Sequence, residues 1–131
     1  MLLIVGHKAP RWPECHVPSW YDYASAESRT QLLGYVKAVV ERYKDHGALE
    51  LWQVENEPFI SFKFGECKGY DPDAVHEEIA LVRSLDSTHP IVITDSGELS
   101  TWIQASQAGD ILGSTLYRVV ETKSGMRFTY D

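Results

Sequence analysis

Two carboxylates and an amide stand together at Glu55, Asn56 and Glu57, directly after residues 49–54, which have the pattern of a strand, and before Pro58. Burying a charged group is expensive, so a strand that ends in such residues either emerges into solvent or delivers them to a site. A positioned carboxyl group can donate and accept a proton, and an amide offers a donor and an acceptor without a net charge. The segment is therefore either a solvated strand end or part of an acid–base site.

The chain around this segment alternates apolar runs with stretches of helical periodicity. Short apolar runs followed by loops predict buried strands, and apolar residues at spacings of three and four predict helices that cover a sheet. We expect strands at residues 2–5, 49–54, 91–94 and 111–116, and helices at about 25–46, 71–85 and 99–108. Repeated strand–helix units of this kind predict a parallel α/β sheet.

Each expected strand turns polar where it ends. His7 follows the first strand, Asn56 and Glu57 the second, Asp95 the third and Tyr117 the fourth. Parallel α/β folds place their sites at the C-terminal ends of the strands. This arrangement favours the site over the solvated strand end.

Composition limits the classes of partner. The chain has 131 residues, which is enough for one domain. It contains 12 Lys and Arg residues against 19 Asp and Glu residues, which gives a net charge of −7. Nucleic-acid binding needs clustered Lys and Arg, so no nucleic acid is expected. No run approaches the length of a membrane span, and the apolar start lacks the features of a signal peptide, so the compartment stays open.

The two cysteines, Cys15 and Cys67, fit no zinc-binding spacing. A metal set built from them with His7 and His16 is conceivable, but we expect no metal and no cofactor. If the loops that carry the cysteines converge, an oxidising compartment could join them, and otherwise they are buried thiols.

The string WQVENEP, which contains Asn56-Glu57-Pro58, resembles strand four of the large clan of retaining (β/α)8-barrel glycoside hydrolases. That clan includes cellulase-like endoglucanases, mannanases and β-galactosidases. LLIVGHKAPRW resembles strand three, and IVITDSGELSTW and DILGSTLYR resemble strands five and six of cellulase-like members. The resemblance covers nearly the whole chain, and it implies a partial TIM barrel of about four consecutive βα units.

A complete barrel of this kind has eight strands and about 250 residues. The resemblance therefore implies that residues 1–131 are an incomplete catalytic domain, an internal fragment without strands one, two, seven and eight. It also implies that Glu57 is the general acid/base and that Asn56 binds the sugar 2-hydroxyl. The nucleophilic glutamate would come from strand seven, outside this chain, while Glu55 has no implied role and is expected to be a structural ion-pair partner.

Further residues at the strand ends are expected to bind substrate. The loop after the first strand offers an aromatic surface and two imidazoles, and the ends of the third and fourth strands offer hydroxyl ligands. The candidates are His7, Trp12, His16, Asp95, Glu98 and Tyr117. Trp12 could instead pack in the core, and either histidine could be held by backbone groups in its loop.

These expectations define a cellulase-like glycosidase that hydrolyses a β-linked oligo- or polysaccharide by double displacement. The alternative from another class is a non-catalytic carbohydrate-binding half-barrel. Either form would expose two apolar sheet edges, which predicts self-association.

Overall fold

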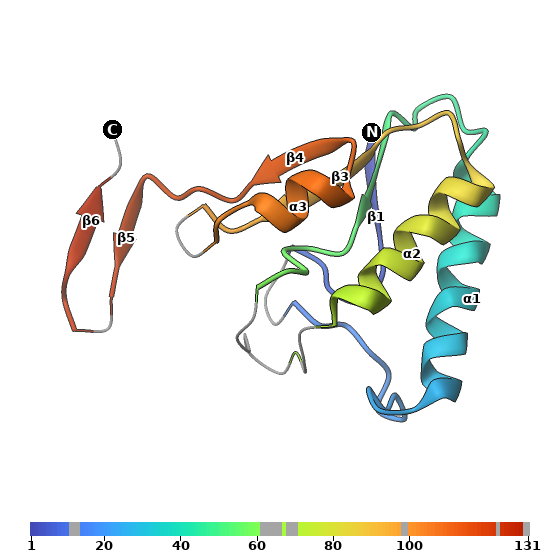
Figure 1. The fold of residues 1–131 in the computed structure, drawn as a ribbon, viewed down its shortest axis with the longest axis horizontal. Helices are drawn as coiled ribbons and strands as arrows, with labels where there is room; N and C mark the ends of the chain where they lie inside the picture. The colour runs from blue at the N-terminus through green and yellow to red at the C-terminus, as the bar shows by residue number, and fades with distance from the viewer. Residues whose placement is uncertain (11–13, 61–66, 68–70, 98–99, 123, 130–131) are drawn as a thin grey trace.

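The computed structural model describes residues 1–10, 14–60, 67, 71–97, 100–122 and 124–129 (Figure 1). Strands and helices alternate along the chain before it ends in a hairpin. The elements are β1 (Leu2–Val5), α1 (Ala26–Tyr43), β2 (Leu51–Val54), α2 (Pro72–Leu85), β3 (Ile91–Asp95), α3 (Ile103–Ala108), β4 (Ile111–Ser114), β5 (Val119–Glu121) and β6 (Arg127–Thr129).

The first four strands form one parallel sheet in the order β1-β2-β3-β4. Val5 pairs with Val54, and Thr94 pairs with Gly113. Each strand lies beside the next one in sequence, with a helix in each connection, which is the arrangement of consecutive units of a barrel. The prediction of a partial α/β barrel is confirmed.

The three helices cover a single face of this sheet. Alternate residues of the paired strands, among them Trp52 and Val54, share one hydrophobic core with apolar residues from all three helices. Trp52 is fully buried, as expected for a core residue. The intervening residues, including Gln53 and Thr94, point to the opposite face, which is the interior of a barrel.

Local signals fix where the two long helices begin. Ser25 caps α1 by accepting a hydrogen bond from Ser28 N at 3.4 Å, and Asp71 caps α2 by accepting one from Ala74 N at 3.0 Å. Pro72 follows Asp71 at the first turn, where its missing N–H is not needed. Asp71 and Pro72 therefore fix the first turn of α2.

The end of α2 is tied to the sheet through Asp86. Its carboxylate accepts hydrogen bonds from Trp52 Nε1 at 2.9 Å and from the backbone of Thr88 at 2.9 Å, and it lies 2.7 Å from His89 Nδ1. Burial opposes ionisation, but these hydrogen bonds lower the pKa of Asp86 to about 2. A charged carboxylate at the C-terminal end of α2 is therefore hydrogen-bonded to the core residue Trp52.

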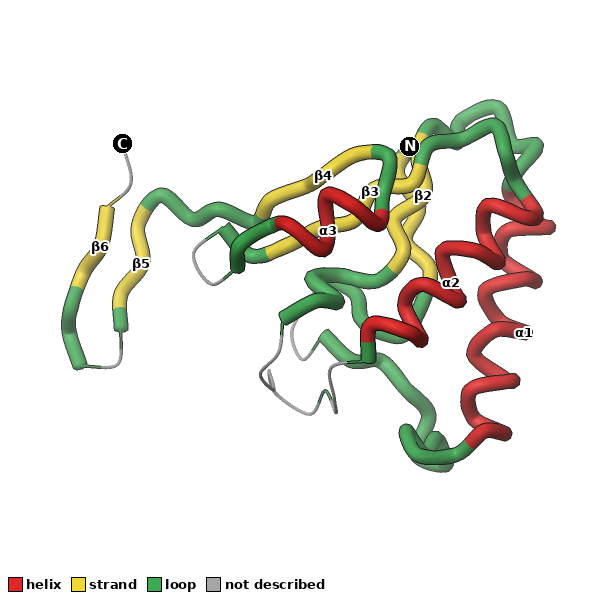
Figure 2. The backbone as a smooth tube through the Cα atoms, viewed as in Figure 1, coloured by secondary structure: helices red, strands yellow, loops and turns green. Residues whose placement is uncertain are grey.

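The C-terminal third differs from the sequence-based expectation. α3 begins at Ile103 rather than near Leu99, which lies outside the described residues, because Trp102 adopts a left-handed φ of 63° and donates from Nε1 to Ser96 O at 2.7 Å. β4 ends at Ser114, two residues early. The hairpin β5–β6 was not expected, and it lies apart from the four-stranded sheet (Figure 2).

Among the described residues, no helix is both long and apolar enough to cross a membrane.

Candidate active site

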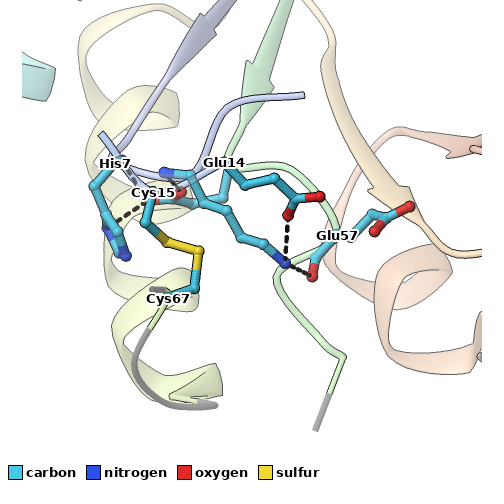
Figure 3. The surroundings of a disulfide bond; sticks show 7 residues. His7, Glu14, Cys15, Glu57 and Cys67 are labelled. Atoms are coloured by element: carbon cyan, nitrogen blue, oxygen red, sulfur yellow. Dashed lines mark hydrogen bonds and ion pairs between the residues drawn. A yellow bond between two sulfur atoms is a disulfide. The ribbon is translucent and has the colours of Figure 1, made fainter. Parts of the chain in front are cut away.

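Glu57 lies just beyond the C-terminal end of β2, and neighbouring elements hold it on both sides. The hydroxyl of Thr115, just after β4, donates to Glu57 Oε1. Lys8 Nζ donates to the backbone oxygen of Glu57 at 3.0 Å, and it lies 3.6 Å from the carboxylate of Glu14 (Figure 3). The Glu57 side chain is half-buried, so it is accessible to a ligand and also fixed in orientation.

Asn56 is almost fully buried beside Glu57, with 3% of its surface exposed. Its Oδ1 accepts from the Thr94 hydroxyl at 3.2 Å and from Gln53 Nε2 at 3.5 Å. These contacts direct the amide oxygen toward the sheet interior and leave the NH₂ group on the other side of the amide. Gln53 of β2 and Thr94 of β3 therefore fix the amide so that its NH₂ group can donate a hydrogen bond to a ligand.

The sequence did not indicate that Gln53, Thr94 and Thr115 belong to this environment. Gln53 lies in β2, Thr94 in β3 and Thr115 just after β4, so no local pattern connects the three. One signal was available: Gln53 is a polar residue inside an apolar strand, and a buried amide requires partners. Its pairing across the sheet would have pointed to the interior face.

His7 does not share the Glu57 environment. Its Nδ1 lies 3.0 Å from Glu55 Oε1, and its ring packs against Tyr21 and Tyr23 with centroid separations of 6.1 and 5.5 Å. In Figure 3 the disulfide lies between His7 and Glu57. Glu55 contacts His7, but its role as a structural ion-pair partner and substrate binding by His7 both stay predictions.

Glu55 is held by more than the histidine. Backbone N–H groups of His7 and Lys8 donate to its two oxygens at 2.9 and 2.5 Å. Gly6 makes room for this carboxylate, because a Cβ at Gly6 would collide with it, and the φ of 107° at Gly6 is one that other residues rarely adopt. The start of the β1 loop is thus built around the Glu55 side chain.

Two helices add a second carboxylate and a guanidinium to this cluster. Glu78 of α2 is buried, has a carboxylate oxygen within 4.8 Å of one of Glu55, and accepts from Arg29 Nη1 of α1 at 2.6 Å. Burial and the negative charge of Glu55 raise the pKa of Glu78 to about 9, although Arg29 opposes the shift. Burial also acts to raise the pKa of Glu55, but the contacts with His7 leave it below its usual range. Of the two carboxyl groups, Glu78 therefore holds its proton more strongly and Glu55 loses its proton more readily.

His7, Glu55 and Glu78 are a described group that could hold a metal ion, since one ligand atom from each lies within 4.8 Å of the others. The two Glu55 oxygens accept from backbone N–H groups and Glu78 Oε1 accepts from Arg29 Nη1, whereas Glu78 Oε2 is buried without a hydrogen-bond partner among the described residues. The two carboxyl groups border a cavity of about 370 Å³ that also contacts Tyr21 and Tyr23.

Replacing Glu78 with glutamine should flatten the pH dependence of stability. A carboxyl group whose folded pKa is raised contributes stability below its unfolded pKa, near 4.5, and loses it as pH rises toward 9. Glutamine keeps a donor for Glu55 and an acceptor for Arg29 without titrating. Glu78→Gln should therefore match the parent near pH 4.5 and exceed it progressively above, by up to about 1.4 kcal/mol per pH unit.

Urea unfolding of both proteins between pH 4.5 and 9 measures this difference. The exposed neighbour Glu77 provides the control, because Glu77→Gln makes the same chemical replacement on the same helix at an exposed carboxylate that also pairs with Arg29. Parallel curves of unfolding free energy against pH for the parent and Glu78→Gln would contradict the raised pKa of Glu78.

A disulfide joins the loop after β1 to the segment after β2. Cys15 and Cys67 are bonded, with Cα atoms 5.2 Å apart, which decides between the disulfide and the free thiols and removes both as metal ligands (Figure 3). Next to Cys15, His16 is exposed and its N–H donates to His7 O at 2.8 Å. His16 and Trp20 line an apolar cavity of about 460 Å³ at the β1 edge of the sheet.

The remaining substrate-binding candidates differ in how far they are buried. Asp95 is 1% exposed, and its carboxylate accepts from Ser96 N at 2.9 Å and from the Ser100 hydroxyl, which directs it into the protein. Tyr117 lies past the end of β4 with 67% of its surface exposed. Trp12 and Glu98 lie outside the described residues. Their roles in substrate binding stay predictions.

The chain is similar in sequence to mannan endo-1,4-β-mannosidases. The chain is 37% identical over 79 residues to a probable mannan endo-1,4-β-mannosidase A-1 of Aspergillus terreus, covering 57% of this chain and 19% of the relative. It is 30% identical over 95 residues to mannan endo-1,4-β-mannosidase A of Emericella nidulans, covering 70% and 22%. The chain thus spans about a fifth of the length of these relatives. No family model matches it.

Solved structures share the fold. An FMN-binding β-glucuronidase from Facaelibacterium prausnitzii matches with a TM-score of 0.58 at 18% identity, over 73% of this chain and 14% of that one. A β-galactosidase from Halorubrum lacusprofundi matches with a TM-score of 0.58 at 14% identity, over 89% and 30%. The resemblance to barrel glycoside hydrolases is confirmed.

Proposed function

We propose that this chain is the part of a glycoside hydrolase barrel that carries the general acid/base Glu57, and that the complete protein hydrolyses a β-linked polysaccharide with retention of configuration. β-Mannan is the first substrate class to consider, because the relatives are named mannan endo-1,4-β-mannosidases. The retaining mechanism and the roles of Asn56 and Tyr117 belong to this proposal.

The observation that carries the proposal is the placement of the Asn56–Glu57 pair. Both residues lie at the C-terminal end of a parallel strand, and Asn56 is fixed from the sheet interior. A buried amide and a half-buried carboxyl side by side can bind a sugar hydroxyl and transfer a proton to the adjacent glycosidic oxygen. A solvated strand end would need none of this support.

In the first step Glu57 donates its proton to the glycosidic oxygen while the bond from that oxygen to the anomeric carbon breaks. A second carboxylate attacks the same carbon, about 5–5.5 Å from Glu57 in retaining enzymes. Water then attacks the anomeric carbon and gives a proton to Glu57, which releases the enzyme carboxylate. Since Thr115 donates to Glu57 Oε1, Oε2 is the oxygen left to carry the transferred proton.

The second carboxylate would come from a later strand of the same barrel. The sheet has edges on which further strands could pair: Leu2 of β1 is 45% exposed, and Ile111 and Leu112 of β4 are 42% and 39% exposed. Apolar edges of this kind also favour association between copies of the chain when they are left uncovered. Self-association through these edges is part of the proposal.

The experiment expresses the complete protein beside residues 1–131 alone and assays both on β-mannan, cellulose and an activated aryl β-glycoside. The complete protein should release reducing sugars and form the product with retained anomeric configuration, which ¹H NMR measures early in the reaction. The isolated chain should be inactive, because a site with one carboxylate lacks the nucleophile.

Glycan binding without hydrolysis by the complete protein would favour the carbohydrate-binding half-barrel. Inversion of the anomeric configuration would contradict the double displacement. Activity in residues 1–131 alone would mean that a carboxylate within the chain is the nucleophile.

A further inference from the structure

The turn that carries Asn56 and Glu57 has an unfavourable backbone conformation. Glu55 and Glu57 have φ values of 57° and 46°, in the left-handed region that residues other than glycine seldom occupy. Each such residue costs on the order of 1–3 kcal/mol and persists only where its surroundings hold it. The contacts that hold this turn therefore determine where the catalytic pair lies.

Three consecutive N–H groups anchor the turn. Glu55 N donates to Val5 O at 2.9 Å and Asn56 N to Lys8 O at 2.8 Å, both through the backbone. Glu57 N donates to the side-chain hydroxyl of Thr94 at 3.0 Å. The third anchor depends on the identity of one side chain.

The Thr94 hydroxyl makes three hydrogen bonds. It accepts from Glu57 N and from Gln53 Nε2, both at 3.0 Å. Both partners are N–H donors, so the hydroxyl's single proton remains for Asn56 Oδ1, 3.2 Å away. One oxygen atom therefore sets the backbone of Glu57 and the amide orientation of Asn56 together.

The position of this hydroxyl is itself fixed by packing. Thr94 is paired with Gly113 of β4, and a Cβ at Gly113 would lie 2.9 Å from the Thr94 methyl. The methyl therefore lies against the surface of Gly113, and a β-branched side chain held there has little rotational freedom. Gln53 adds a second constraint, because its Nε2 also donates to Glu55 O at 3.1 Å.

We propose that Thr94 is a positioning residue: its hydroxyl orients the Asn56 amide and the Glu57 backbone for catalysis without touching the substrate. The inference rests on the proposed function, since it concerns the same pair. It assigns to Thr94 a role in the reaction that the sequence did not indicate.

Two matched pairs of residues at position 94 of the complete enzyme test the hydroxyl. Valine retains the shape of threonine and replaces the hydroxyl with a methyl group, whereas alanine and serine differ from each other by the hydroxyl alone. Thr94→Val should lower kcat by about 10- to 100-fold, the effect of misplacing catalytic groups by about 1 Å. KM should change by less than threefold, since the hydrogen bonds that valine removes act mainly in the transition state.

Thr94→Ser should retain activity within about threefold of the parent, and Thr94→Ala should fall at least tenfold below Thr94→Ser. Thermal unfolding of each variant identifies any that does not fold. If Thr94→Val is unfolded, the alanine–serine comparison decides.

Equal activity in the members of each pair would overturn the inference, because the hydroxyl would then have no role. An equal loss in Thr94→Ser and Thr94→Ala would also overturn it, since the methyl would be the important group. A parent enzyme inactive on every glycan would overturn the proposed function and this inference with it. An active parent with an insensitive Thr94→Val variant would overturn this inference alone.

Discussion

Glu57→Gln in the complete enzyme should reduce the turnover of an unactivated β-mannan oligosaccharide by about 10²–10⁴-fold, the usual contribution of general acid–base catalysis. Glutamine keeps the shape of the side chain and can accept the Thr115 hydrogen bond, but it cannot transfer a proton. Substrate binding should be nearly unchanged. Steady-state kcat and KM on mannohexaose measure the two effects separately.

The same variant should react differently with an aryl glycoside whose leaving group needs no protonation. The first step should remain fast and the second should slow, because Glu57 also activates the water that breaks the covalent intermediate. A burst of released phenol followed by slow turnover would report this split. Glu50→Gln is the control, since Glu50 is an exposed glutamate just before the opposite end of β2.

Near-parental hydrolysis of the unactivated oligosaccharide by Glu57→Gln would remove Glu57 from the acid/base role. A similar loss in Glu50→Gln would show that the effect comes from the fold or from net charge rather than from proton transfer.

The second large effect should come from the disulfide. Replacing Cys15 and Cys67 with serine should lower the free energy of unfolding by about 4 kcal/mol by the chain-entropy relation, because the bond closes a loop of 52 residues. The loop contains β2 and all of α1, so the unfolded chain gains freedom over more than a third of its length. Urea denaturation of the oxidised protein and of the double variant measures the difference.

Reduction of the parent by dithiothreitol provides an independent comparison, since it opens the same loop without changing any residue. The reduced parent and the double serine variant should agree within about 1 kcal/mol, the general scale of a net hydrogen-bond change. Equal stability of the oxidised parent and the double variant would mean that the loop is already constrained in the unfolded state.

The sheet could be predicted because its signals are local. The apolar runs of β1 to β3 are bounded by proline, glycine or charged residues, and α2 begins with Asp71-Pro72. α3 has no such signal: Trp102 occupies its N-cap position, and its side chain makes no capping hydrogen bond to the helix. Its true start depends on the contact between Trp102 and Ser96, which no periodicity reports.

The site was predictable only in part for a related reason. Asn56 and Glu57 were identified by a contiguous motif, whereas Thr94 and Thr115 act over 37 and 58 residues of sequence. His7 was expected to bind substrate because it follows the first strand, at the end of the sheet where α/β folds place their sites. The contact of its Nδ1 with Glu55 Oε1 at 3.0 Å joins residues far apart in the sequence, so no local pattern indicated it.

The close fit between Gly6 and the Glu55 carboxylate implies a direction for sequence divergence among proteins that share this turn. Position 6 is closed to other residues twice over, by its φ of 107° and by the carboxylate that fills the space of a Cβ. Position 55 is restricted as well, because its carboxylate accepts from the backbone N–H groups of His7 and Lys8. Among homologues the glycine and the carboxylate should therefore occur together, and a side chain at position 6 should occur only where position 55 has become smaller and the loop has changed its backbone.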